Sequence, residues 1–393
     1  MMEPVIIRTT RKEFFDGTHR VLPPDETYRR IEPLMERIGV TELVDITSFD
    51  RLGIPVYSAL RPSAARGAGS VHAGKGKDPL QAKVSAMMEA IERFSGEFRG
   101  DHMEFASFEE IGIRRAVDPK ELILPRKMQM GERIHWTPSW DLLNQEERFV
   151  PGNAVFHPYP SMGTESLFRS DTNGLAGGNA TEEAILHGIL EVIERDALSS
   201  AEQAQSLGKR VIIDSDGPAR KLQEIFLQQD IAIHLWLLTG KTGVPTVAAA
   251  ADDLTAREPG LLVTGSGCHT CPEIAVIRAL TEVAQSRASY LHRGRKVPMR
   301  EQILQKAGYE RLKRINRMWF CEGGGEVSLS QIPDRSTEYI DRDIGMVLQE
   351  VEKHAESVCM CDLSRTGVPV VRIVIPGFEV SYIDRSRIRS RNF

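Results

Sequence analysis

The most regular hydrophobic pattern in the chain lies in the stretch LHGILEVIERDAL, residues 186–198. Its apolar residues recur at three- and four-residue steps, at Leu186, Ile189, Leu190, Ile193, Ala197 and Leu198. This spacing is the apolar stripe of an amphipathic helix. Glu191 and Glu194 are three residues apart, so a helix places them side by side, and Arg195 follows directly. We therefore predict a helix that carries two neighbouring carboxylates beside a guanidinium group.

Two other runs with helical periodicity repeat this arrangement. SAMMEAIER carries Ser85, Glu89, Glu92 and Arg93, and RALTEVAQSR carries Arg278, Glu282, Gln285 and Arg287. If the three helices meet, five carboxylates converge, and their repulsion requires a counter-charge such as a hard divalent cation. The nearby arginines then suit phosphate oxygens, which they bind as planar forks. The alternative is that each Glu-x-x-Glu-Arg segment is a solvated helix face with local ion pairs.

The pattern also predicts the elements around these helices. Helices are expected at about 27–39, 79–98, 217–229, 272–293 and 337–357, and strands at 44–46, 55–60 and 369–375, with strand-like runs between 209 and 250. Asp78 is the expected N-cap of the second helix, and Thr181 is expected to start the central one. Arg20 and Thr27 bracket the first helix start, which either holds a phosphate on backbone N–H groups or is simply capped.

Glycine-rich segments precede all three carboxylate helices. Residues 69–75 match most of the G-x-x-x-x-G-K pattern, but Gly76 stands where a P-loop needs Ser or Thr to reach magnesium. We therefore reject a P-loop and interpret the segment as a flexible loop that presents Lys75 and Lys77. Residues 174–178 form an expected turn near an anion-binding helix start. Residues 265–269 are expected to form a tight turn, with His269 as a base or a capping residue.

Composition and charge narrow the class of protein. The 393 residues are 41% hydrophobic and 27% charged, as in soluble globular proteins, and they suffice for one large domain or two ordinary ones. The net charge of −5 and the pI of about 6.1 argue against a general nucleic-acid binder. No apolar run reaches the roughly 18 residues of a membrane span, and the first fifteen or so residues lack a signal-peptide core. A cytoplasmic protein is expected.

The five cysteines and the basic C-terminal stretch leave several interpretations open. Cys268-x-x-Cys271 and Cys359-x-Cys361 could share a zinc ion or form a redox pair, but an odd, sparse set also suits ordinary thiols. Cys321 stands apart. The stretch 385–391, RSRIRSR, is expected to be a mobile tail, with a binding role as the alternative.

Four stretches together resemble the YcaO family. They are GKGKDPLQAKVSAMMEAIERFS, DTNGLAGGNATEEAILHGILEVIERDA, GSGCHTCPEIAVIRALTEVAQSR and VPVVRIVIPG, in the family's order and over roughly residues 60–380. The resemblance implies an α/β fold with helices packed on mixed and antiparallel sheets. It also implies an ATP site formed by three Glu-bearing helices without a P-loop. The expected organisation is an N-terminal segment 1–60 that completes the nucleotide site, a core domain 61–384 and a basic tail 385–393.

The resemblance also implies roles for individual residues, with ATP and Mg²⁺ as cofactors. The implied magnesium ligands are Glu89, Glu92, Glu191, Glu194 and Glu282. The implied nucleotide contacts are Arg20, Thr27, Lys75, Ser85, Asn179, Glu183, Arg195, Arg278 and Glu282. Glu191, Glu194 and Arg195 are the implied catalytic residues. Phosphoryl transfer chiefly needs positioning and charge neutralisation, which this set of residues can supply.

By resemblance, the activity is ATP-dependent phosphorylation of a peptide backbone amide oxygen. The chain has no proline after Pro376 and no fused peptide-clamp domain, which counts against azoline formation. The length and the stretch GTHRVLPPDET look most like methanogen members associated with thioglycine formation in methyl-coenzyme M reductase. The expected partners are that protein substrate, a sulfide source and a TfuA-like protein, and a homodimer is an option. The alternatives are an azoline-forming cyclodehydratase and a non-catalytic ATP-binding adaptor.

Overall fold

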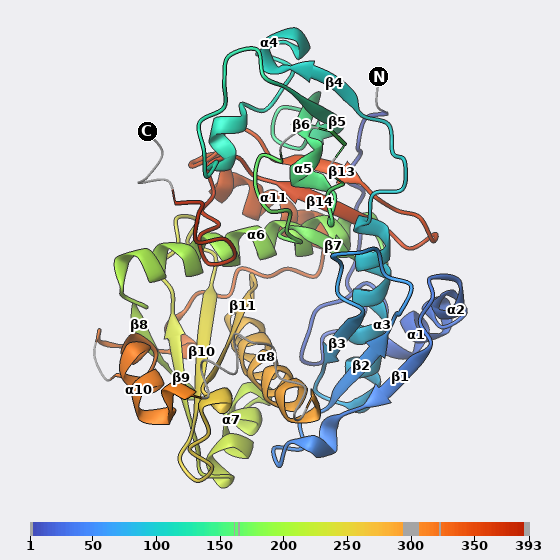
Figure 1. Ribbon diagram of the computed structural model, residues 1–393. Helices are drawn as coiled ribbons and strands as arrows, with labels where there is room; N and C mark the ends of the chain where they lie inside the picture. Colours follow the sequence, from blue (N-terminus) through green and yellow to red (C-terminus); the bar gives the residue numbers. More distant parts are fainter. Residues whose placement is uncertain (1–2, 161, 164–165, 294–305, 322–323, 389–393) are drawn as a thin grey trace.

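The computed structural model describes residues 3–160, 162–163, 166–293, 306–321 and 324–388 (Figure 1). Within these residues the named strands form three sheets, and the helices that carry the glutamates lie between or against them. The predicted α/β class is confirmed. None of the described helices combines the length and the apolar character that a membrane crossing requires.

The first sheet is antiparallel and has the order β1-β2-β3. Its strands and the helices beside it are β1 (Glu42–Asp45), β2 (Val56–Leu60), β3 (Val71–Lys75), α1 (Pro24–Ile31), α2 (Leu34–Arg37), η1 (Thr47–Phe49) and α3 (Pro79–Gly96). The helix predicted over 79–98 is confirmed, and the Asp78 side chain caps it by accepting a bond from the Gln81 amide. The single helix predicted over 27–39 is wrong, because the chain leaves α1 before Pro33, whose ring lacks an N–H and opposes helix continuation.

The second sheet has the order β11-β10-β9-β8-β12, in which only the β12–β8 pair is parallel. Its elements are β8 (Lys209–Ile212), α7 (Pro218–Gln228), β9 (Ile231–Leu237), β10 (Thr246–Asp253), η3 (Pro259–Leu261), β11 (Val263–Cys268), α8 (Pro272–Arg293), α10 (Tyr309–Ile315), η4 (Arg317–Trp319), β12 (Glu326–Ser328) and η5 (Leu329–Gln331). Helices α7 and α8 match their predicted ranges. α8 contacts β10 and β11 and also reaches β3 of the first sheet.

The third sheet has the order β4-β5-β13-β14-β7, with β6 paired to β5. Its elements are β4 (Glu104–Ser107), α4 (Phe108–Ile111), η2 (Pro119–Leu122), β5 (Arg133–Asp141), β6 (Glu146–Pro151), α5 (Gly152–Val155), β7 (Leu175–Gly177), α6 (Thr181–Ala204), α11 (Ile340–Glu352), β13 (Cys359–Asp362) and β14 (Val370–Val374). The buried strand predicted at 369–375 is confirmed as β14. The helix predicted at 337–357 is the shorter α11.

Helix α6 joins the second and third sheets. It crosses the middle of the molecule in Figure 1 and contacts β14 on one side and β11 on the other. Its N-terminal half packs into one apolar core with β14 and α11, and its C-terminal half packs against Trp236 and Trp319 in another. Because most of α6 is buried, its carboxylates face the interior of the fold rather than bulk water.

Two glycine segments predicted as loops are strands instead. The segment 69–75 enters β3 at Val71, and 265–269 lies mostly in β11. A Cβ at Gly267 would lie 2.6 Å from the Arg278 Cβ, and one at Gly74 would collide with the Ala86 backbone. These glycines therefore allow strands to lie directly against α3 and α8. Lys75 is consequently the last residue of a strand rather than part of a flexible loop.

The C-terminal stretch also departs from its prediction as far as it is described. Arg387 is buried, and its guanidinium donates to the Ile123 carbonyl at 3.2 Å and to Asp171 at 3.2 Å. Upstream, the Glu379 amide donates to Asp196 and the Tyr382 amide donates to Ser199, so the segment lies along α6. The expectation of mobility is wrong for residues 385–388, and 389–393 lie outside the described residues.

A buried ion network joins the first and second sheets through α8. Arg287 on α8 donates to Asp50 at 2.8 and 3.0 Å and to Asp253 on β10 at 3.0 Å. All three side chains are at most 4% exposed. Because desolvated charges are stable only when paired, this network fixes the position of α8 between the two sheets.

We expect Asp50→Ala to lower the free energy of unfolding by about 3–5 kcal/mol, because it leaves a buried guanidinium underpaired. The control is Asp25→Ala, which breaks the exposed Asp25–Arg29 pair on α1 and should change stability by about 1 kcal/mol or less. Urea unfolding of the unliganded protein measures both. Equal losses in the two variants would contradict a structural role for the network.

Candidate nucleotide and metal site

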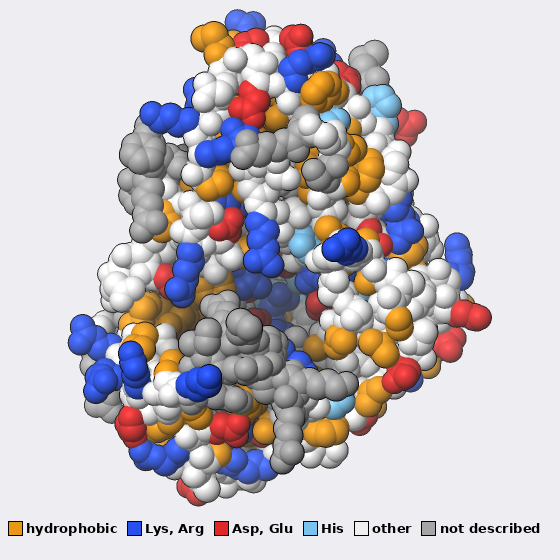
Figure 2. Space-filling model, in the orientation of Figure 1, with side chains coloured by type: hydrophobic (Ala, Val, Ile, Leu, Met, Phe, Trp, Pro, Cys, Tyr) orange, Lys and Arg blue, Asp and Glu red, His pale blue; other side chains and the backbone are white. Residues whose placement is uncertain are grey.

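The three carboxylate helices meet at one hollow of about 390 Å³. Every residue predicted for the site lines it: Arg20, Thr27, Lys75, Ser85, Glu89, Glu92, Asn179, Glu183, Glu191, Glu194, Arg195, Arg278 and Glu282. Figure 2 shows a hollow near the centre of one face, with Lys and Arg side chains inside it. The interpretation of these segments as separate solvated helix faces is therefore wrong, because all three faces line the same hollow.

The α3 carboxylates carry their own counter-ion. The Arg93 guanidinium lies 3.2 Å from Glu89 and 3.8 Å from Glu92. Glu92 also accepts a hydrogen bond from the Gly177 amide at 3.2 Å, which ties α3 to the end of β7. The Arg93 Nη1 atom is buried and has no hydrogen-bond partner among the described residues. Arg93 thus retains an unused donor beside the hollow.

The α6 carboxylates divide into anchored and free groups. Glu183 accepts a hydrogen bond from the Val21 amide at 2.8 Å and lies 3.8 Å from the Arg20 guanidinium, so it holds the N-terminal segment against the site. Glu194 accepts from the Ser266 hydroxyl at 2.7 Å and from the Cys268 amide at 3.0 Å, so it holds β11. Glu191, which lies between them on the helix, lines the hollow without such an anchor.

Helix α8 contributes one carboxylate, Glu282, and one guanidinium group, Arg278, to the site. Glu282 accepts a charge-assisted hydrogen bond from Lys75 at 2.9 Å, which links α8 to β3. Arg278 lies 3.3 Å from the His187 ring on α6. Each of the three helices is therefore joined to another part of the site by a polar contact across the hollow.

Burial disfavours the ionised form of the carboxyl groups and so shifts their pKa values. The pKa of Glu92 is raised to about 8, chiefly by burial and also by neighbouring Glu89 and Glu191, while Arg93 opposes the rise. Burial likewise raises the pKa of Glu191, although Arg195 and Arg93 oppose this change. Burial alone would raise the pKa of Glu282, but Lys75 and Arg195 lower it overall. The cations of the protein therefore compensate Glu282 and leave Glu92 and Glu191 undercompensated.

The residues fit magnesium and a phosphate ligand. Among the described residues no three His, Cys, Asp or Glu side chains form a metal site by themselves. Mg²⁺ rarely uses such a cage and is commonly held by one or two carboxylates, phosphate oxygens and water. Glu191 and the α3 carboxylates line the hollow and can supply the first. The Arg93 Nη1 and Arg278 Nε atoms are buried without a hydrogen-bond partner among the described residues, which suits phosphate. Within the described residues, Cys359 and Cys361 belong to one apolar core and Cys268 to another, so the two cysteine pairs are not gathered in a four-cysteine cluster.

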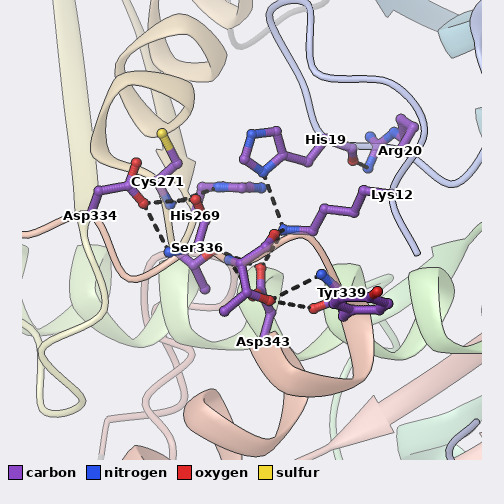
Figure 3. Close-up of polar contacts among 11 residues, drawn as sticks. Lys12, His19, Arg20, His269, Cys271, Asp334, Ser336, Tyr339 and Asp343 are labelled. Carbon is purple, nitrogen blue, oxygen red and sulfur yellow. Dashed lines mark hydrogen bonds and ion pairs between the residues drawn. The ribbon is translucent and has the colours of Figure 1, made fainter. Parts of the chain in front are cut away.

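The N-terminal segment that carries Arg20 is fixed by a buried polar cluster (Figure 3). Lys12 donates to Asp343 at 2.6 Å and to the Thr337 carbonyl at 2.7 Å, and its ammonium lies 3.2 Å from the His19 ring. His19 in turn packs edge-to-face on His269. His269 accepts a bond from the Cys271 amide at 2.9 Å, so of its two predicted roles the capping one fits.

Arg93 and His187 line the hollow and contact predicted site residues, but neither was in the predicted set. Arg93 follows Glu92 in the first motif, just as the predicted Arg195 follows Glu194, so the repeat itself held the signal. His187 lies four residues after Glu183 and four before Glu191, which places all three on one helix face. Both line the hollow, as does Thr172 ahead of β7, for which we find no sequence signal.

Comparison with known proteins identifies the family of the chain. Residues 73–379 match the family model described as YcaO cyclodehydratase, ATP- and Mg²⁺-binding. The chain is 46% identical over 375 residues to an uncharacterized protein of Methanothermobacter thermautotrophicus, covering 94% of this chain and 97% of that one. It is 29% identical to an uncharacterized protein from the tfuA 3′ region of Rhizobium leguminosarum bv. trifolii, covering 93% of this chain and 90% of that one.

A solved structure gives the same fold with a nucleotide bound. YcaO from Methanopyrus kandleri, bound with AMPPCP and Mg²⁺, superposes with a TM-score of 0.80 at 32% identity. The match covers 96% of this chain and 97% of the other.

The cluster in Figure 3 predicts a specific acid sensitivity. Burial and the Lys12 charge lower the pKa of His19 from 6.5 to about 4. An unfolded chain therefore binds a proton that the folded chain excludes, and folding stability is lost as pH falls from about 6.5 to about 4. In His19→Gln this loss should be smaller by roughly 1–2 kcal/mol, measured by urea unfolding across that range. The control is His102→Gln, at an exposed position, which should lose as much free energy of unfolding over this pH range as wild type does. The same loss in His19→Gln as in wild type would contradict the prediction.

Proposed function

Because the chain belongs to the YcaO family of ATP-dependent peptide-modifying proteins, we propose that it phosphorylates a backbone amide oxygen of a peptide at the central hollow. The activated amide then becomes a thioamide. The single observation that carries the proposal is the convergence of three carboxylate helices, with Arg195, Arg278 and Lys75, on one enclosed space. This arrangement can hold magnesium and a triphosphate with no covalent contribution from the protein.

The residues divide into positioning and charge-compensating roles. Arg195 and Arg278 can bind phosphate oxygens through their guanidinium groups. Lys75, which bonds Glu282 in the unliganded protein, can instead bind a phosphate once another cation lies beside Glu282. Glu191 and the α3 pair Glu89 and Glu92, which share Arg93 as a counter-ion, are the carboxylates that would hold magnesium. Bound magnesium would neutralise charge on the transferred phosphoryl group. Glu194 keeps β11 in place beside them through its two hydrogen bonds.

The proposed reaction balances without a redox partner. The amide oxygen attacks the γ-phosphorus of ATP, and ADP leaves. Hydrosulfide then adds to the amide carbon, and the phosphorylated oxygen departs as inorganic phosphate while a proton is lost. The net change is replacement of the amide oxygen by sulfur, with ATP converted to ADP and phosphate. Transfer of this kind depends mainly on alignment of the two reactants, which a preorganised hollow favours.

The relatives guide the choice of substrate and partner. Two of the proteins compared come from methanogens, Methanothermobacter and Methanopyrus, and the Rhizobium relative is encoded beside tfuA. We therefore propose a glycine of methyl-coenzyme M reductase as the modified residue and a TfuA-like protein as the partner that delivers sulfide. The family model is described as a cyclodehydratase, which keeps azoline formation as the second candidate.

Glu191→Gln should weaken binding of ATP in the presence of Mg²⁺ by roughly 10–100-fold, because a charged ligand is replaced by a neutral one. Isothermal calorimetry measures the affinity. Glu191 is preferred to Glu194, whose replacement would also release β11. Glu202→Gln is the matched control on the same helix, since Glu202 lies outside the hollow. The difference in ATP affinity between Glu191→Gln and wild type should become smaller when magnesium is withheld. If Glu191→Gln binds ATP as tightly as wild type in the presence of magnesium, the proposed metal site is wrong.

The chemical outcome is tested by mass spectrometry of a peptide that spans the modified glycine. With ATP, Mg²⁺, sulfide and the TfuA-like protein, the peptide should gain the mass of an oxygen-to-sulfur exchange, and ADP should form in equal amount. A peptide that loses water instead supports the cyclodehydratase. Nucleotide binding without any peptide-dependent phosphate release would favour the adaptor. Glu191→Gln, tested alongside, should abolish the product.

A further inference from the structure

His187 occupies a place in the hollow that the predicted roles do not explain. It lies on α6 between Glu183 and Glu191, on the same helix face, and it lines the space where the nucleotide is proposed to bind. Its Nε2 atom lies 3.3 Å from the Arg278 guanidinium on α8. His187 is thus a contact between two of the three carboxylate helices.

The chemistry of arginine fixes the tautomer of this histidine. A guanidinium group can only donate hydrogen bonds, so the Nε2 atom of His187 accepts from Arg278 and carries no proton. The proton therefore lies on Nδ1. Gly177, at the end of β7, donates its amide N–H to Glu92 at 3.2 Å. Two separate polar contacts at the hollow thus join α8 to α6 and the end of β7 to α3.

A neutral ring suits this place better than a charged group. Burial lowers the pKa of His187 well below its ordinary value, and Arg278 and Arg20 lower it further. A lysine here would repel Arg278, and a carboxylate would bind it so strongly that the guanidinium would be less available to a phosphate. A neutral acceptor orients Arg278 and leaves the rest of its donors free. The Arg278 Nε atom is buried and has no hydrogen-bond partner among the described residues.

We propose that His187 is a positioning residue that holds Arg278 toward the bound nucleotide through the contact at its Nε2 atom. The inference rests on the proposed nucleotide site. It predicts that His187 acts on affinity through Arg278 rather than through the stability of the fold. A neutral acceptor of similar reach should therefore replace it, and an apolar side chain of similar size should not.

The test is a double-mutant cycle read by calorimetry with AMPPCP and Mg²⁺. We expect His187→Met to weaken binding by about tenfold, since it removes one hydrogen bond to a charged group. His187→Gln places an amide oxygen near the Nε2 position and should stay within about threefold of wild type. Arg278→Met should weaken binding by itself, and adding His187→Met to it should cause little further loss. His135→Met is the control for loss of a histidine on β5, outside the hollow.

Three results would overturn the inference. Wild-type affinity in His187→Met would show that the contact with Arg278 does not affect binding. An equal loss of affinity from His187→Met in the wild-type protein and in Arg278→Met would show that His187 does not act through Arg278. Failure of His187→Gln to restore affinity would rule out the acceptor role. Thermal unfolding shows whether each variant folds; should His187→Met not fold, His187→Leu takes its place in the cycle.

The proposed function and this inference can fail separately. If Glu191→Gln loses affinity while the His187 variants keep it, only the positioning role is wrong. If Glu191→Gln also keeps wild-type affinity, the nucleotide site is misplaced and the positioning role falls with it.

Discussion

The structure depends on the enclosure of several carboxylates in one hollow. Like charges at such distances are tolerated only when cations lie among them, and the chain places Arg93, Lys75 and Arg195 there. Even with Arg93 beside it, burial and the neighbouring carboxylates raise the pKa of Glu92 to about 8, so its ionised form is unfavourable without a further cation. The folded protein is therefore poised to take up further positive charge. A family that binds ATP with Mg²⁺ fits this imbalance.

The same carboxylates also hold the fold together. Glu183 fixes the N-terminal segment through the Val21 amide, and Glu194 fixes β11 through Ser266 and Cys268. Their oxygens are directed by these bonds, whereas Glu191 is free to respond to a ligand. Site and scaffold are thus not separable in this protein. A change at an anchored carboxylate would disturb both, so the free ones report more clearly on ligand chemistry.

The hollow itself does not specify what happens to an activated amide. Charge compensation and alignment serve phosphoryl transfer in the same way, whether sulfide or a peptide side chain attacks next. The nucleophile must therefore be selected by whatever brings it to the carbon, such as a partner protein or the peptide itself.

Sequence periodicity by itself determined the three carboxylate helices, because the i, i+3 and i, i+4 geometry of a helix is local. Resemblance to a family, rather than periodicity, supplied the set of site residues, and all of them line the hollow. Local reasoning failed where the outcome depended on distant neighbours. Glycines at 74 and 267 were interpreted as loop formers, yet they are strand residues that let helices approach closely. Only the tertiary structure could pair Lys75 with Glu282 or place His187 beside Arg278, because these partners lie far apart in sequence and their contacts depend on how the sheets orient the helices.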